Sequence, residues 1–196
     1  MTPACARLEF IPDSAADFLF VEGRPRDGFV PLVHMTEGLP IADRYPPGPD
    51  GMRLHLTPTM PGLRPGSFVG NTGRLVILHR DALDALAAEV DLGPHEVLPL
   101  TIVDHKGRDH TRDYVLFSPI GSVDALNEAA SEIRRYPDGT INRVVAPQLQ
   151  AEALAQAPDV FRLAREPRTV LFSGRAVAAA GALGLTNLML IPVEVR

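Results

Sequence analysis

The chain is poor in the residues that build disulfides and thiolate metal sites. Its 196 residues include one cysteine, Cys5, and no tryptophan. A single cysteine excludes an intramolecular disulfide framework and a zinc site made of several thiolates. Cys5 could act as a nucleophile only if a histidine approached it in space, and an inert thiol is the more ordinary role beside small residues. The low cysteine content fits a reducing compartment.

Long apolar runs and an excess of positive charge are also missing. The longest stretch of small apolar residues, 176–185, is about half as long as a membrane span. The first residues have neither the basic nor the apolar region of a signal peptide. The net charge is −5, and Lys106 is the single lysine among 19 basic residues. We therefore predict a cytoplasmic protein that binds neither membrane nor nucleic acid, whereas a basic protein partner would suit the charge.

Proline and glycine set one part of the chain apart. Residues 39–73 contain seven prolines and six glycines, a density that excludes a long helix or a central strand. We predict an N-terminal region over residues 1–73, with strands in ARLEFI, DFLFVEG and RLHL and a Pro/Gly-rich loop. Residues 74–196 are predicted to form an α+β domain. One continuous domain over both regions is the alternative.

From Arg74 onward the apolar pattern becomes regular. RLVIL (74–78), RDALDALAAEV (80–90) and EVLPLTIV (96–103) predict a strand, a helix and a strand. RTVLFS, GRAVAAAGALG and LMLIPVEV repeat this order near the C-terminus. Two hairpins, a short helix in QLQAEALAQA and a strand in DVFRLAR are predicted between these units. The fold class is therefore α+β: a mixed, mainly antiparallel sheet with hairpins, two strand–helix–strand units and few short helices.

The two longer helices differ in their surroundings. The first carries its acidic residues outside the apolar stripe, so this side should face water. The second, at 174–184, is small and apolar on all sides, which predicts burial in the core. The alternative is burial at a subunit interface of an oligomer.

Two histidines and three aspartates lie within residues 104–113, between two apolar strands. Matching Leu98 with Leu116 sets the register and leaves a three-residue loop with a central glycine. The two histidines then fall on opposite faces of the ribbon and cannot share a metal ion. We predict a solvated hairpin tip. The expected cross-strand pairs at this tip are Asp104 with His110 and His105 with Asp109.

Other catalytic templates fit poorly. GSFVGNTG (66–73) is rich in glycine but precedes a strand, whereas a phosphate cradle follows a strand and opens a helix. FSGRAVAAAG (172–181) has that position but lacks the G-x-G-x-x-G spacing. Neither G-x-S-x-G nor H-E-x-x-H occurs. The sequence therefore predicts neither an enzyme nor a cofactor.

Several segments after Arg74 follow one another in an order that a known family shares. EVLPLTIVDHKG (96–107), DVFRLA (159–164) and LGLTNLMLIPV (183–193) match best. In these segments the chain resembles a family of bacterial immunity proteins of polymorphic-toxin systems, formerly a domain of unknown function abundant in myxobacteria and proteobacteria. It departs from the pattern in having no tryptophan and in carrying Asn187 where a glycine often follows the threonine.

The resemblance implies a cytoplasmic protein that binds and neutralises one cognate toxin, often a nuclease, without catalytic residues of its own. An inhibitor of a basic nuclease needs an acidic face that competes with the phosphate backbone and speeds association. An ordinary solvated helix face is the alternative interpretation of these charges. The candidate toxin-binding residues are Asp81, Asp84, Glu89 and Asp91 on the first helix, with Asp104 and Asp109 at the hairpin tip.

A second functional reading stays open. An enzyme or a small-ligand-binding protein could have its site under residues 39–73, because a long irregular segment in a compact domain is often functional. A cleft lined by Arg53, His55 and Asn71 would favour this reading.

Overall fold

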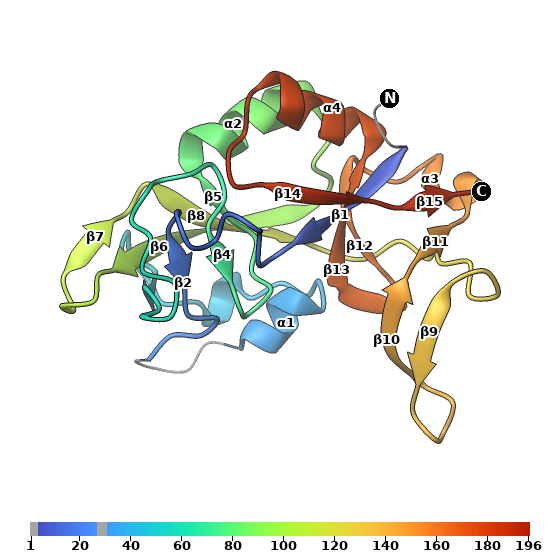
Figure 1. The fold of residues 1–196 in the computed structure, drawn as a ribbon, viewed down its shortest axis with the longest axis horizontal. Helices are drawn as coiled ribbons and strands as arrows, with labels where there is room; N and C mark the ends of the chain where they lie inside the picture. The colour runs from blue at the N-terminus through green and yellow to red at the C-terminus, as the bar shows by residue number, and fades with distance from the viewer. Residues whose placement is uncertain (1–3, 27–30) are drawn as a thin grey trace.

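Two β-sheets and a pair of helices organise the chain in the computed structural model, which describes residues 4–26 and 31–196 (Figure 1). The four-stranded sheet has the order β12 (Val160–Leu163), β13 (Glu166–Ser173), β1 (Cys5–Glu9), β14 (Met189–Pro192). The five-stranded sheet has the order β3 (Met52–His55), β6 (His95–Val103), β8 (Tyr114–Pro119), β5 (Ile77–His79), with β7 (Asp109–Thr111) paired to β6.

Smaller elements complete the architecture. The two-stranded ladders join β2 (Phe20–Val21) to β4 (Gly70–Asn71), β9 (Glu132–Arg135) to β10 (Ile141–Ala146), and β11 (Gln148–Leu149) to β15 (Glu194–Val195). The helices are α1 (Leu32–Thr36), the 3-10 turn η1 (Ala42–Arg44), α2 (Arg80–Glu89), α3 (Ala151–Leu154) and α4 (Gly174–Ala182). Short helices and mostly antiparallel pairing confirm the predicted α+β class.

Both main sheets combine strands from the two predicted regions. β1 lies between β13 and β14, and β3 pairs with β6 in parallel. β3 is the edge strand of the five-stranded sheet. Residues 5–9 and 52–55 therefore contribute to the two main sheets, whose other strands come from residues 77–192.

The two strand–helix–strand units have the same arrangement. In the first, β5 and β6 lie on either side of β8 and are both antiparallel to it. In the second, β13 and β14 lie on either side of β1 in the same way. Helices α2 and α4 pack against each other above the sheets (Figure 1). Apolar residues of both units meet in one cluster that includes Leu83, Leu86, Phe117 and Phe172.

Helix α4 corrects one prediction. Its small apolar composition predicted burial on all sides, but only Ala176 and Ala180 are buried. Ala178 and Ala182 are exposed. The prediction of burial in the core was wrong for this side, because alanine and glycine contribute little apolar area and their exposure costs little. Burial of the same side at a subunit interface stays a prediction.

A buried arginine joins distant parts of the chain. Arg162 on β12 is 2 % exposed. Its Nε donates to the carbonyl oxygen of Pro119 at 3.0 Å, and Nη1 donates to those of Pro167 at 2.8 Å and Thr36 at 3.4 Å. Among the described residues no carboxylate pairs with it, and burial lowers its pKa to about 10. Carbonyl dipoles therefore take the place of a counter-ion.

Asn187 occupies a turn with an unusual backbone conformation. Its φ is 58°, in the left-handed region, where asparagine is better tolerated than most residues with a side chain. Its Oδ1 accepts a hydrogen bond from Ser14 Oγ at 2.7 Å, and its Nδ2 donates to the carbonyl of Phe68 at 2.9 Å. Asparagine thus provides the conformation that glycine would, together with two tertiary hydrogen bonds.

We expect Arg162→Met to lower the free energy of unfolding by about 3 kcal/mol or more, because it leaves buried carbonyls without donors. Arg165→Met is the matched control. That side chain is 53 % exposed and pairs with Asp124 and Glu128 at the surface, so its loss should cost less than about 1 kcal/mol. Urea denaturation of both variants measures the difference, and equal losses would contradict the role of Arg162.

Candidate functional site

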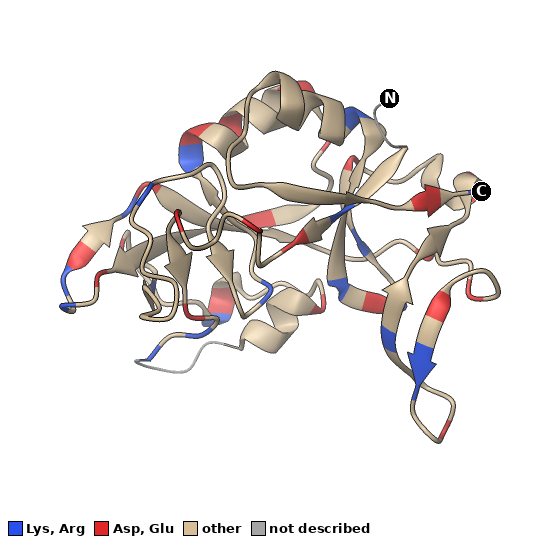
Figure 2. Cartoon of the chain, in the orientation of Figure 1, with Lys and Arg blue, Asp and Glu red and all other residues tan. Residues whose placement is uncertain are grey.

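The acidic side of α2 faces water. The helix buries Ala82, Leu83 and Leu86, whereas Asp81, Asp84 and Glu89 are exposed. Figure 2 shows where the acidic residues lie along the helix. The side chain of Asp81 is 90 % exposed, and its nearest ion-pair partner is His79 Nδ1 at 3.9 Å. Within the described part of the chain, Asp84 and Glu89 have no ion-pair partner. These residues therefore keep their charge available to a binding partner.

The C-terminal end of α2 has a cation nearby. Arg175 of α4 donates from Nη2 to the carbonyl oxygen of Glu89 at 2.5 Å, and its Nη1 lies 3.8 Å from Asp159 Oδ2. The Oδ1 atom of Asp91 accepts the backbone N–H of Gly93 at 2.9 Å. A cation thus lies near each end of α2, because the exposed Arg80 is its first residue, while the carboxylates of Asp84 and Glu89 have no ion-pair partner among the described residues.

The hairpin tip differs from its predicted register. Leu98 pairs with Leu116 as predicted, but the ladder shifts between Ile102 and Val103, so that Val103 pairs with Asp109. The predicted pairs Asp104 with His110 and His105 with Asp109 are therefore wrong. The cause is a turn at Asp104, whose carboxylate accepts the backbone N–H groups of Lys106 at 2.8 Å and Arg108 at 2.9 Å.

Arginines neutralise both carboxylates of the tip. Asp104 Oδ2 accepts Arg108 Nη2 at 2.7 Å, and the hydrogen bonds from the backbone and side chain of Arg108 lower the pKa of Asp104 to about 2. Asp109 accepts Arg53 at 2.6 Å and Arg112 at 2.7 Å, and these arginines lower its pKa below the usual value. The structure does not bring these two residues together with the carboxylates of α2 into one acidic surface.

The other residues considered as nucleophile or ligand-binding candidates have structural roles. Cys5 is 1 % exposed, and burial raises its pKa to about 11, so the thiol stays protonated at neutral pH. Among the described residues, no group of three histidine, cysteine or acidic side chains is placed to hold a metal ion. Asn71 closes its own turn through hydrogen bonds to Leu75, while Arg53 is bound to Asp109.

A cleft of about 580 Å³ lies beside the Pro/Gly-rich segment. Its described lining residues come from 20–24, 57–60 and 72–73 and Ile11, and do not include Arg53, His55 or Asn71. Among these described lining residues the one carboxylate is Glu22, which Arg26 binds at 2.6 Å, and that hydrogen bond lowers the pKa of Glu22. The cleft therefore presents no carboxyl group suited to accept a proton at neutral pH.

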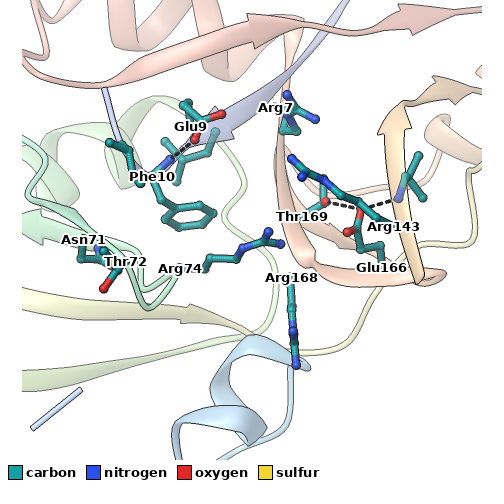
Figure 3. Close-up of a pocket in the computed structure, with 13 residues that line it drawn as sticks. Arg7, Glu9, Phe10, Asn71, Thr72, Arg74, Arg143, Glu166, Arg168 and Thr169 are labelled. Atoms are coloured by element: carbon teal, nitrogen blue, oxygen red, sulfur yellow. Dashed lines mark hydrogen bonds between the residues drawn. The ribbon is translucent and has the colours of Figure 1, made fainter. Parts of the chain in front are cut away.

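A second cleft, of about 320 Å³, is lined by arginines, and we call it the arginine cleft. Arg7 comes from β1, Arg74 from the turn between β4 and β5, Arg143 from β10 and Arg168 from β13. Figure 3 shows Arg7, Arg74 and Arg143 pointing into a common space, while Arg168 points away from it. The sequence analysis missed this site because its residues lie far apart in the chain.

The arginines of this cleft lack counter-ions. None of the four has an ion-pair partner among residues 4–26 and 31–196, and Arg7 makes one long hydrogen bond, of 3.5 Å, to the Val145 carbonyl. The two carboxylates of the cleft are turned to other donors. Glu166 accepts Val144 N at 3.3 Å and Thr169 Oγ1 at 3.1 Å, and Glu9 accepts Phe10 N at 3.1 Å (Figure 3).

The turn that carries Arg74 is held in a costly conformation. Arg74 has φ 57°, a left-handed conformation that an ordinary side chain rarely adopts. Asn71 enforces it: Oδ1 accepts Leu75 N at 2.9 Å, and Nδ2 donates to Leu75 O at 2.8 Å. Asn71 itself is fully buried, and its N–H donates to Phe10 O at 2.9 Å. Such strain persists where the surroundings determine the backbone, and it is frequent at functional sites.

Comparison with known proteins adds no assignment: no protein-family model matches the chain, and no curated protein matches it. Among the residues that the structure describes, no helix combines the length and the apolar character that a membrane crossing requires.

We expect Arg74→Gly to be more stable than Arg74→Ala by about 1 kcal/mol, because glycine adopts the left-handed conformation without a Cβ clash. At Arg168, in strand β13, we expect the alanine variant to be more stable than the glycine variant, since glycine weakens a strand. Thermal unfolding of the four variants measures both differences. The same order at both positions would argue against strain at Arg74.

We expect the stabilising effect of the Asp104 charge to depend on pH. Because folding lowers its pKa to about 2, the carboxylate stabilises the hairpin above pH 4 and loses this effect as the pH falls toward 2. Asp104→Asn should therefore lower Tm at pH 7, with a difference from the parent that shrinks below pH 4. Asp43→Asn, at an exposed position of η1, is the control and should show no such trend.

Proposed function

We propose that this protein is an immunity protein of a polymorphic-toxin system, which binds a cognate toxin in the cytoplasm and neutralises it by protein–protein contact. The resemblance of residues 96–107, 159–164 and 183–193 to that family suggests the class. The observation that carries the proposal is the outward side of α2. Asp84 and Glu89 lie exposed there without ion-pair partners from the described residues, and Asp81 has only His79 at 3.9 Å.

Exposed and unpaired carboxylates suit an inhibitor of a basic protein. A nuclease binds the phosphate backbone through clustered lysine and arginine side chains, and an acidic helix face can compete for them. As far as residues 4–26 and 31–196 are concerned, no salt bridge has to break before Asp84 or Glu89 meets such a partner. Asp104 and Asp109 are less suited, because each already binds an arginine of its own chain. We therefore centre the proposed contact on Asp81 and Asp84.

The test is capture of the toxin followed by an activity measurement. We expect the tagged protein to retain one basic protein from lysate of its host, and to suppress the toxicity of that protein when both are expressed together. Asp81→Lys with Asp84→Lys should weaken binding at least tenfold and abolish protection, because attraction becomes repulsion at the contact.

The matched control is Asp43→Lys with Glu152→Lys, which makes the same change of charge at exposed positions of η1 and α3. It should protect as the parent does. If the control loses protection equally, the effect is one of net charge and the contact is not on α2. If the captured proteins include none whose toxicity the parent suppresses, the immunity proposal is wrong.

A further inference from the structure

We infer that the arginine cleft binds the phosphoryl groups of a small phosphorylated ligand. The site is separate from the proposed toxin contact, because no residue of α2 lines it. The inference does not depend on the immunity proposal, and it rests on the position, direction and pairing of Arg7, Arg74 and Arg143.

The charge of the cleft differs from that of the chain. The protein has a net charge of −5, yet three arginines point into the cleft, which two glutamates also line. Like charges that converge without counter-ions repel one another, and the repulsion raises the free energy of the empty site. A bound anion would remove this cost, so affinity for anions is built into the arrangement.

The direction of approach favours a phosphoryl group. Arg7, Arg74 and Arg143 come from a strand, a turn and a hairpin, and they reach the common space from different sides (Figure 3). A carboxylate accepts hydrogen bonds close to one plane, whereas phosphoryl oxygens are arranged tetrahedrally and accept from several directions. Guanidinium forks bind such oxygens in pairs. A volume of about 320 Å³ also lies within the range of small-molecule sites.

The two glutamates do not form ion pairs with the arginines of the cleft. The Oε2 atom of Glu166 already accepts hydrogen bonds from Val144 N and Thr169 Oγ1, which hold the carboxylate at the base of β13. Glu9 accepts the N–H of Phe10 beside it. Both carboxylates thus accept hydrogen bonds from residues in the walls of the cleft, while N–H groups of the arginines stay available to a ligand. The strained turn at Arg74 also contributes to the site, because it directs the guanidinium of Arg74 into the arginine cleft.

The test is isothermal titration calorimetry of the full chain with inorganic pyrophosphate, ADP and citrate at constant ionic strength. We expect pyrophosphate to bind and citrate to bind at least tenfold more weakly. Arg143→Gln and Arg74→Gly should each weaken pyrophosphate binding about tenfold or more, because each removes a charge-assisted contact. Arg44→Gln, which removes one arginine charge outside the cleft, should change the affinity less than about twofold.

Arg74→Gly keeps the test independent of folding, since glycine relieves the backbone strain at that position. ADP that binds as tightly as pyrophosphate or more so would support a phosphorylated organic ligand, and pyrophosphate preferred over ADP would support a compact inorganic one. Citrate bound as tightly as pyrophosphate would overturn the phosphoryl assignment. Absence of pyrophosphate binding at millimolar concentration, or equal weakening by Arg44→Gln, would overturn the site itself.

Discussion

The buried guanidinium of Arg162 is the constraint around which the two sheets are joined. It donates to carbonyl oxygens at the end of α1, at the end of β8 and near the start of β13. A charge removed from water must be met by dipoles of the protein, so these three segments have to arrive together. Gly38 shows how close the approach is: a Cβ there would lie 2.6 Å from Gly121 O and 3.0 Å from Arg162 Cδ. The arginine cleft is lined by Glu166, Arg168 and Thr169 at the same end of β13, so its geometry depends on this junction.

Arginine serves three different purposes in this chain, which has a single lysine. Arg162 is buried and bound to carbonyls, and Arg53, Arg108 and Arg112 neutralise the hairpin tip. The arginines of the cleft remain without ion-pair partners among the described residues. The acidic residues also differ in their ion pairing. Those at the hairpin tip bind arginines, whereas most of those on α2 have no ion-pair partner among the described residues. The protein thus presents one acidic surface and one basic cleft, each suited to a different kind of ligand.

The main features of the fold were predictable because they depend on local patterns. Alternating and helical periodicity predicted β6, α2 and β13, and apolar matching predicted the pairing of Leu98 with Leu116. The prediction was wrong at the hairpin tip, where the turn at Asp104 shifts the ladder by hydrogen bonds that apolar matching does not include. It was wrong again for α4, where composition alone does not determine how much of a small helix is covered.

The sequence by itself determined the α+β class, the two strand–helix–strand units and the acidic, outward side of α2, because each follows from residues close together in the chain. Only the tertiary structure decided that β1 separates β13 from β14, that Arg162 is buried, and that Arg7, Arg74 and Arg143 face one space. These features join residues that are distant in sequence, and their formation depends on pairing and packing energies that no local pattern encodes.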